Sequence, residues 1–300
     1  MHVAGGPSWR IRALRALIRR MPRGRYRFLA STAPSHGRLT AQLADELGGA
    51  RFDCDLSDAL SREVCFTGLY EPPVTRVFQR HVRRGGTIVD AGANWGYFSL
   101  IAAVLCGDQG RVIALEPDPR QFEALARNLS LNGFAHVDAM RAAAADIAGT
   151  LTLLGYDDRA ANRGVSRVAA ADEDARATSR FEAPAVSIDA ITASAAAVDL
   201  VKIDVEGAED LVLRGMQDGL ASRRYRAILL ELHPALLQAR GVDPDACVRL
   251  LIDHGYHGWT IDASPAAYRR AIDPDAAIEP LLRPLAEWRA VAWPHLLWLC

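Results

Sequence analysis

The sequence predicts an α/β fold: a doubly wound, mostly parallel sheet of seven strands, preceded by an N-terminal helical extension. From Thr87 onward, short apolar segments alternate with helical segments, which is typical of repeated strand–helix–strand units. Such units connect with right-handed crossovers and place helices on both faces of one sheet. Several apolar segments end in polar or glycine-rich residues. Because doubly wound sheets bind ligands at the carboxyl ends of their strands, we expect the functional site there.

The individual elements follow from length, apolar character and turn residues. Strands are expected at 87–90, 111–116, 137–142, 199–203, 226–232, 257–261 and 296–299. A further short strand is expected at 150–154 and a long polar loop at 155–184. Helices are expected at 94–105, 118–131, 206–216 and 234–254, the last with a break near residues 241–244. Residues 66–300 are therefore predicted to form one α/β domain.

The N-terminal region, residues 1–65, is predicted to be a basic helical extension. Residues 1–44 contain nine arginines and no acidic residue, whereas the other 256 residues contain 26 basic and 36 acidic side chains. Apolar side chains recur on one helical stripe within residues 9–21, which predicts a basic amphipathic helix. We expect this helix to pack on the following domain and to keep its arginines in water. Peripheral contact with an anionic membrane is the alternative.

Composition and charge exclude several classes of protein. Half of the residues are apolar and 24% are charged, as in soluble globular proteins. The longest apolar stretches, such as Tyr97–Cys106, are too short to span a membrane, and the N-terminus does not resemble a signal peptide. The five cysteines form no C-x-x-C pair, which favours a reducing, cytoplasmic location. The acidic main part of the chain argues against a nucleic-acid partner.

A glycine-rich turn, Asp90–Gly96, follows the first strand and leads into a helix, and Glu116 ends the next strand. Glycines let the backbone approach a ligand closely, and a carboxylate at the end of the second strand suits a ribose diol. Dinucleotide folds use the spacing G-x-G-x-x-G, but here the spacing is G-x-x-x-G, and Asp90 would repel a pyrophosphate. The turn therefore favours S-adenosylmethionine, which carries an ammonium, a sulfonium and no phosphate, over a nicotinamide cofactor.

Polar residues also follow two later strands. Lys202 is the only lysine among 35 basic residues, and strand alternation places it on the same side as Asp204. Glu206, Glu231 and His233 follow at the same edge of the sheet. Such a set can position a substrate hydroxyl and remove its proton, since histidine titrates in the useful range. A divalent metal is an alternative, but the spacings D-x-E and E-x-H are not diagnostic, so no metal ligand is assigned.

The position of Lys202 inside a strand restricts its role. A buried lysine must be paired to stay charged. We expect it to pair with Glu231 on the neighbouring strand or with Asp204. A direct catalytic role is the second interpretation.

Several segments resemble motifs of the FkbM family of methyltransferases. Val89–Leu100 is similar to the first motif, Ala114–Pro119 also matches, and Lys202–Glu209 resembles the most specific signature. Gly68–Pro72 resembles the stretch before the first motif, and Val186–Asp189 the short strand before the fourth. The resemblance covers about residues 66–262. It implies a class I methyltransferase fold, Rossmann-like, that binds S-adenosylmethionine.

The resemblance also implies roles for individual residues. The implied cofactor-binding set is Tyr70, Glu71, Asp90, Gly92, Asn94, Gly96, Glu116, Pro117, Ala143 and Asp204. Within it, the residues from Asp90 to Gly96 would line the methionine part and Glu116 the ribose, while Asp204 would lie beside the methyl group. Tyr70 and Glu71 would close over the cofactor. The chain departs from many methyltransferases at residues 142–145, where four alanines stand in place of an acid that contacts adenine.

The predicted reaction is methyl transfer from sulfur to a hydroxyl of a small natural product, a sugar or a glycan. Orientation of the two reactants supplies most of the rate, and a base assists the attacking alcohol. His233 is the predicted base, Asp204 is the alternative, and Lys202 is a further candidate catalytic residue. Other possible functions are N-methylation with the same cofactor site, a nicotinamide-dependent oxidoreductase and a non-catalytic binding module.

Overall fold

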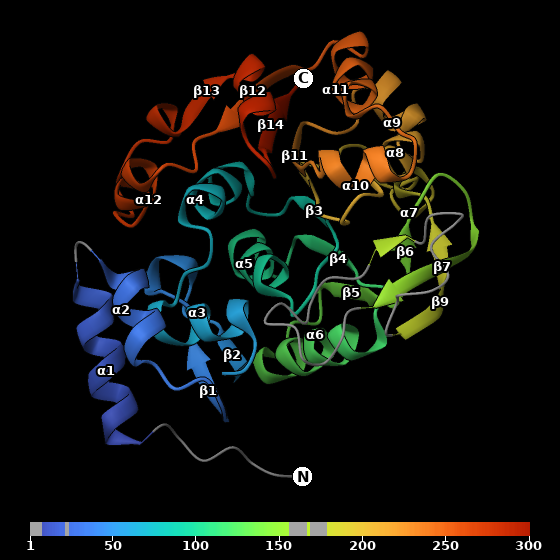
Figure 1. Ribbon diagram of the computed structural model, residues 1–300. Helices are drawn as coiled ribbons and strands as arrows, with labels where there is room; N and C mark the ends of the chain where they lie inside the picture. Colours follow the sequence, from blue (N-terminus) through green and yellow to red (C-terminus); the bar gives the residue numbers. More distant parts are fainter. Residues whose placement is uncertain (1–7, 22–23, 156–166, 169–178) are drawn as a thin grey trace.

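The computed structural model describes residues 8–21, 24–155, 167–168 and 179–300. Its centre is an eight-stranded sheet in the order β13-β12-β14-β11-β10-β3-β4-β5, with helices on both sides (Figure 1). The strands of this sheet are β3 (Thr87–Ala91), β4 (Arg111–Leu115), β5 (Val137–Met140), β10 (Leu200–Ile203), β11 (Ala227–Glu231), β12 (His257–Ile261), β13 (Leu282–Pro284) and β14 (His295–Leu299). Strands β3, β4, β5, β10 and β11 pair in parallel.

The sheet confirms the predicted doubly wound fold and contains one strand more than predicted. All seven expected strands are present, and β13 is the additional one, paired with β12 at the edge of the sheet. Strand β14 runs antiparallel between β11 and β12. An antiparallel strand begins where its parallel neighbours end. The first residue of β14 therefore lies at the edge of the sheet that carries the predicted site.

The helices that flank the sheet include all four predicted segments, with shifted boundaries, and three helices that were not predicted, at residues 72–81, 217–221 and 265–271. They are α4 (Pro72–His81), α5 (Tyr97–Cys106), α6 (Pro119–Asn132), α8 (Glu209–Arg214), α9 (Gln217–Ala221), α10 (Pro234–Ala239), α11 (Pro244–Asp253) and α12 (Pro265–Ala271). Helix α5 begins three residues later than predicted because Asn94 and Gly96 have left-handed backbone, with φ of 52° and 87°. Helix α8 is delayed for the same reason, since Glu206 and Gly207 have φ of 50° and 89°.

A second sheet has the order β6-β9-β7-β8. Its strands are β6 (Ala143–Ala144), β7 (Gly149–Gly155), β8 (Arg167–Val168) and β9 (Ser179–Val186). Strand β7 confirms the short strand predicted at 150–154. The predicted loop over 155–184 is wrong at its C-terminal end, where β9 pairs with β7 over seven successive residues. Residues 156–166 and 169–178 of that predicted loop lie outside the described residues.

The strand predicted at Val186–Asp189 is also wrong, because the chain turns into a helix there. Strand β9 ends at Val186, and α7 (Ile188–Ile191) follows. The Ser187 side chain accepts a hydrogen bond from the backbone N–H of Ala190 and so caps this short helix.

Two hydrophobic cores lie on the two faces of the central sheet. Strand alternation places Ile88 and Leu229 in one core, and Val89 and Leu230 in the other. The first core includes residues of α4 and α5, and the second includes residues of α8, α9 and α11. The sheet is therefore buried on both faces, as expected for parallel strands with apolar sequences.

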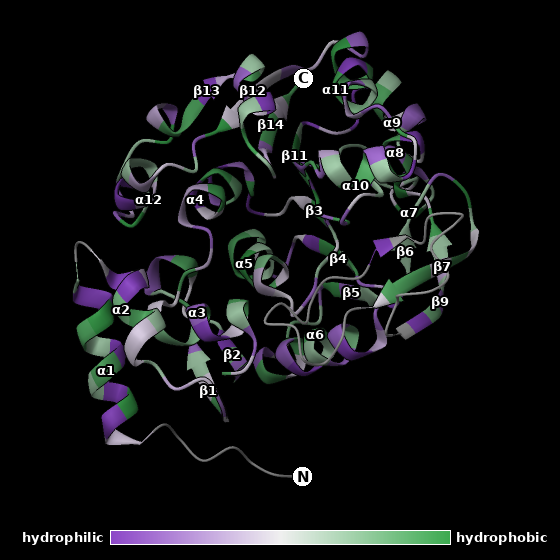
Figure 2. Cartoon of the chain, in the orientation of Figure 1, coloured by the Kyte–Doolittle hydropathy of each residue, from purple (hydrophilic) through white to green (hydrophobic). Residues whose placement is uncertain are grey.

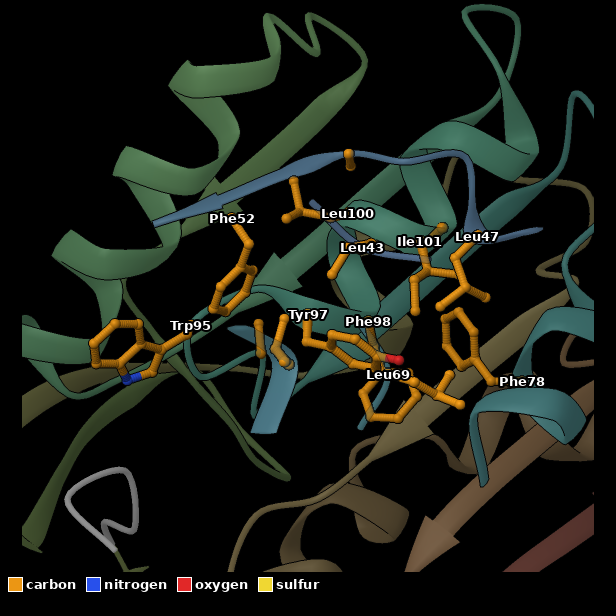
Figure 3. Packing of buried hydrophobic residues seen from close by; sticks show 14 of the residues in the cluster. Leu43, Leu47, Phe52, Leu69, Phe78, Trp95, Tyr97, Phe98, Leu100 and Ile101 are labelled. Carbon is orange, nitrogen blue, oxygen red and sulfur yellow. The ribbon is translucent and has the colours of Figure 1, made fainter. Parts of the chain in front are cut away.

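The N-terminal extension contains α1 (Trp9–Arg20), α2 (Arg25–Thr32), the antiparallel pair β1 (Arg38–Gln42) and β2 (Arg51–Asp55), and α3 (Ala59–Thr67). It is thus helical only in part. Figure 3 shows Leu43, Leu47 and Phe52 of this region packed beside Leu100 and Ile101 of α5. The extension and the α/β domain share this core.

Helix α1 presents Ile18 to the interior and most of its arginines to solvent, but Arg19 is partly buried and donates to the backbone carbonyl of Gln42. Figure 2 shows hydrophilic and hydrophobic residues along the same helix. Ile18 is fully buried in the shared core, whereas the side chains of Trp9 and Leu17 are 68% and 52% exposed. Among the helices that the structure describes, none combines the length and the apolar character needed to cross a bilayer.

The neighbouring residues Ile18 and Leu17 test whether α1 contributes to the stability of the whole chain. We expect Ile18→Ala to lower the free energy of unfolding by about 2–5 kcal/mol, because it leaves a cavity in the shared core. Leu17→Ala, one position away on the exposed side, is the control and should change it by less than about 0.5 kcal/mol. Urea denaturation measures both. Equal, small effects would show that α1 is only loosely attached.

Candidate active site

A pocket of about 380 Å³ lies where β3, β4, β10 and β11 end. Ten of the twelve predicted site residues line it: Tyr70, Glu71, Gly92, Asn94, Glu116, Pro117, Ala143, Lys202, Asp204 and His233. Two do not. Asp90 is buried behind the wall, and Gly96 packs against Leu125 of α6. The topology therefore gathers residues from four strand ends and from the segment before α4 into one cavity.

The glycine-rich turn after β3 abuts the turn after β10. Gly92 has a φ of +84°, and a Cβ on it would lie 1.7 Å from the backbone oxygen of Asp204. The backbone N–H of Asp204 in turn donates to the carbonyl of Ala91 at 3.0 Å. Only glycine combines this backbone conformation with so close a contact. The first motif and the lysine-containing motif are thus held together by backbone contact.

Two buried carboxylates follow β3 and β4. Asp90 Oδ2 accepts a hydrogen bond of 2.6 Å from the Ser99 hydroxyl, and its Oδ1 has no hydrogen-bond partner among the described residues. Glu116 accepts backbone N–H bonds from Asn94 at 2.8 Å and from Asp118 at 2.9 Å. Burial raises the pKa of Asp90, and it raises the pKa of Glu116 to about 8. Both carboxyls would therefore be stabilised by a ligand that brings positive charge or hydroxyl donors.

Lys202 is the cation of the pocket. Its Nζ lies 2.9 Å from Asp204 Oδ2 and 4.7 Å from the centre of the Phe98 ring. Burial lowers the pKa of Lys202, but the charges of Asp204 and Asp90 outweigh burial and raise it above its usual value. Burial alone would raise the pKa of Asp204, but the ammonium of Lys202 outweighs burial and holds the pKa below its usual value. Of the two partners expected for Lys202, the ion-pair partner is Asp204.

His233 lies between carboxylates just after β11. Its Nδ1 is 2.7 Å from Glu209 Oε1, and its Nε2 is 3.2 Å from Glu206 Oε2. Burial lowers the pKa of His233, but the hydrogen bond to Glu209 and the nearby carboxylates outweigh burial and raise it. Because Glu209 holds Nδ1, Nε2 is the nitrogen that faces the pocket carboxylates. This is the arrangement of a histidine oriented by a carboxylate, which suits proton transfer at the other ring nitrogen.

The segment before α4 forms the opposite wall. The backbone N–H of Tyr70 donates to the Tyr97 hydroxyl at 3.0 Å, and the two rings meet edge to face. Glu71 has left-handed backbone with a φ of 41°, and it directs its carboxylate toward His295, at 3.4 Å from Nε2. These contacts fix both residues at the pocket wall, where the resemblance to the FkbM family implied that they would close over a cofactor.

Sequence reasoning missed two residues that contact the predicted set. Glu209 was assigned no role, because the helix dipole is enough to explain a carboxylate at a helix start, but it is fully buried and orients His233. His295 was not singled out. The sequence predicted the strand that follows it but not that this strand runs antiparallel, which is what brings its first residue to the pocket. That direction places His295 directly opposite Glu231 in the β11–β14 register. The only sequence signal for His295 was a lone histidine before an apolar run.

A comparison with protein families identifies the class of protein. Residues 90–257 match the model of the methyltransferase FkbM domain. This match covers more than half of the chain and includes the glycine-rich turn, Glu116, the lysine-containing motif and His233. The chain contains a methyltransferase FkbM domain. It belongs to the FkbM family, which confirms the resemblance of its motifs and the class I fold that the resemblance implied.

The individual proteins to which the chain is similar have low sequence identity to it. The methyltransferase sdnD of Sordaria araneosa is 32% identical over 158 residues, which cover 44% of this chain and 60% of that protein. The match thus spans about three fifths of the curated relative. An S-adenosylmethionine-dependent O-methyltransferase of Thermotoga maritima is similar with a TM-score of 0.40 at 13% identity, over 90% of this chain and 95% of that one. A fibrillarin of Aeropyrum pernix, in complex with natively bound S-adenosylmethionine, has a TM-score of 0.40 at 10% identity, over 91% and 86%.

Lys202 offers a test of the buried pair. We expect Lys202→Met to lower the free energy of unfolding by about 3–5 kcal/mol, because it leaves Asp204 buried without its counter-charge. Lys202→Arg should also destabilise the protein, since a guanidinium does not fit the compact site between Asp204 and the Phe98 ring. The control is Arg249→Met, which breaks the exposed ion pair with Asp243 and should have little effect.

Chemical denaturation at neutral pH gives all three values. Equal stability of Lys202→Arg and the unchanged protein would contradict a requirement for lysine.

Proposed function

We propose that this methyltransferase uses S-adenosylmethionine to methylate a hydroxyl group of a small natural product, a sugar or a glycan. One observation carries the proposal. The pocket joins the glycine-rich turn and Glu116 on one side to Asp204 and His233 on the other. The glycine-rich turn and Glu116 suit a cofactor that contains adenosine, while Asp204 and His233 suit an acceptor that must lose a proton.

The residues present fit S-adenosylmethionine. Asp90 Oδ1 is buried without a hydrogen-bond partner among the described residues, and the Gly92 backbone leaves no room for a Cβ. Each carboxylate oxygen of Glu116 accepts one backbone N–H, so lone pairs remain for the two ribose hydroxyls. The turn has the spacing G-x-x-x-G rather than the G-x-G-x-x-G of pyrophosphate sites, and the charge of these acids suits the ammonium and sulfonium. This supports a methyl donor over a nicotinamide dinucleotide.

When bound, S-adenosylmethionine supplies an electrophilic methyl group on a positively charged sulfur. The chain's own residues then orient the acceptor and handle its proton. Asp204 is held rigidly by Lys202 at 2.9 Å and by its backbone bond to Ala91. A carboxylate fixed in this way positions an acceptor hydroxyl without reorganising, which is the main contribution expected for this reaction.

His233 is the proposed base. Glu209 fixes its Nδ1, so Nε2 and the adjacent Glu206 carboxylate form a pair that takes up the acceptor proton. Burial raises the pKa of Glu206, and the surrounding carboxylates raise that of His233, so the pair accepts a proton most readily at a pH above neutral. The proton of the acceptor then moves to the pair as the oxygen attacks the methyl group.

The acceptor itself is proposed from the lining of the pocket. Its polar wall is acidic, while Leu151 and Leu153 of β7 and Trp293 add apolar surface. A polyhydroxylated small molecule with an apolar part matches this mixture. A cytoplasmic location is part of the proposal, and it is supported by the free state of all five cysteines, four of them buried.

The cofactor assignment predicts a selective loss of affinity. Glu116→Gln keeps the size of the side chain but removes its charge, and it should raise the dissociation constant of S-adenosylmethionine about tenfold or more. Glu123→Gln, on the exposed side of α6, is the matched control and should leave the constant unchanged. Isothermal titration calorimetry measures both. Equal affinities of the two variants would remove Glu116 from the cofactor site.

The base assignment predicts a loss of turnover without a loss of cofactor. His233→Ala should lower kcat by about 10²–10⁴-fold, the usual contribution of a general base, and should bind S-adenosylmethionine with unchanged affinity. His257→Ala alters a histidine whose side chain is exposed and serves as the control. Unchanged turnover of His233→Ala would leave Asp204 as the candidate base.

The reaction itself is tested with a methyl-labelled donor and a panel of hydroxylated and amino-bearing acceptors. Mass spectrometry of the products locates the label. We expect label on oxygen, and label on nitrogen would replace the proposal by N-methylation. Failure to bind S-adenosylmethionine at all would falsify the proposed function.

A further inference from the structure

Three metal-ligating side chains from separate elements meet at the wall of the pocket. Glu71 precedes α4, Glu231 ends β11, and His295 begins β14. Their nearest ligand atoms all lie within 4.8 Å of one another. We propose that Glu71, Glu231 and His295 bind one divalent transition-metal cation of the Mn²⁺ or Zn²⁺ type. The sequence alone assigned no metal ligand, because the spacings D-x-E and E-x-H were not diagnostic. Glu71 and His295 are 224 positions apart.

The geometry of His295 points to a metal ligand. Its Nε2 lies 3.1 Å from Glu231 Oε2 and 3.4 Å from Glu71 Oε2. It is nevertheless buried without a hydrogen bond to either oxygen, since neither lies in line with the ring nitrogen. In tetrahedral or octahedral sites with bonds of about 2.1 Å, neighbouring ligand atoms are about 3.0–3.4 Å apart. The two distances from His295 Nε2 thus match the spacing of ligands around a common centre, and all three ligand atoms lie within 4.8 Å of one another.

The charge of the pocket is a second, independent reason. Six carboxylates line it, from Asp58, Glu71, Glu116, Asp204, Glu206 and Glu231, whereas its only lysine is Lys202. In the part of the chain that the structure describes, the ion-pair partners of Glu71 and Glu231 are histidines alone. Buried carboxylates need a counter-charge or a metal. A divalent cation between Glu71 and Glu231 supplies it, since no lysine or arginine of the described residues forms an ion pair with either carboxylate.

The donor set selects the type of metal. Two carboxylate oxygens and one imidazole nitrogen suit Mn²⁺ or Zn²⁺, while Mg²⁺ and Ca²⁺ prefer oxygen ligands alone. Three protein ligands leave positions open for water or substrate, as in catalytic rather than structural sites. Glu71 and Glu231 line the pocket, so those positions would face the acceptor. This role in orienting the acceptor hydroxyl rests on the proposed function, whereas metal binding itself does not.

A neighbouring group, Asp204, Glu206 and His233, also offers three ligand atoms within 4.8 Å of one another. One of its members, Asp204, is already paired with the Lys202 ammonium at 2.9 Å. A metal cation there would lie beside this positive charge and be repelled by it. Among the described residues, the ion-pair partners of Glu71 and Glu231 are histidines, so the group around His295 is the better site.

The test uses the full chain after removal of metals with a chelator, titrated with Mn²⁺ and Zn²⁺ by calorimetry and, for Mn²⁺, by electron paramagnetic resonance. We expect one site per chain. Glu71→Gln and His295→Gln should each weaken binding at least tenfold. The matched controls are Glu279→Gln and His257→Gln, whose side chains are exposed and lie outside the site, and they should bind like the unchanged protein. Circular dichroism checks that each variant is folded.

Two outcomes would overturn the metal site. One is the absence of stoichiometric binding by the unchanged protein, which would make His295 a protonated link between two carboxylates. The other is binding that survives in Glu71→Gln and His295→Gln but is lost in His233→Gln, which would move the metal to the neighbouring group. S-adenosylmethionine binding is measured on the same samples. Cofactor binding without metal binding overturns this inference alone, whereas a lack of cofactor binding overturns the proposed function.

Discussion

The burial of one positive charge among many negative ones is the constraint on which the site depends. Lys202 lies in the central strand β10, and its ammonium is close enough to compensate Asp204 directly and Asp90 through space. The side of the pocket formed by β3 and β10 is therefore neutralised from within the protein. On the side formed by β11, β14 and the segment before α4, the ion-pair partners of Glu71 and Glu231 among the described residues are histidines. One part of the pocket therefore has its negative charge balanced by Lys202. The other part carries carboxylates that a bound cation would stabilise.

Most of the fold could be predicted because parallel strands buried on both faces have a simple signature. Segments such as Ile88–Val89 and Ala227–Leu230 are short and apolar, which favours strands buried on both faces. The errors occur where a local signal is ambiguous. Helices α5 and α8 begin late because Asn94 and Glu206, ordinary residues by sequence, adopt left-handed backbone that only the packed turns impose. Strand β9 was missed because its polar sequence is stabilised by pairing with β7, a contact between distant segments.

The site could be predicted wherever it follows the carboxyl end of a parallel strand, because that rule needs only strand positions. It gave Glu116, Asp204 and His233 their places in one pocket. The rule could not predict His295, since this residue begins a strand rather than ending one. His295 lies at the site only because β14 runs antiparallel beside β11. Glu209 was missed for a related reason, because a charge at a helix start has an adequate explanation that hides its second role.

The N-terminal extension is connected to the chemistry through α5. Phe52 of β2 stacks with Trp95 at 6.4 Å between ring centres, in the turn that precedes this helix. The first turn of α5 carries Tyr97, whose hydroxyl holds the backbone of Tyr70, and Phe98, whose ring lies against the Lys202 ammonium. Displacing the extension would therefore loosen the two contacts that position the pocket wall and its lysine. The same hydrophobic core therefore stabilises the basic extension and holds the site in place, although no predicted catalytic residue lies in the extension.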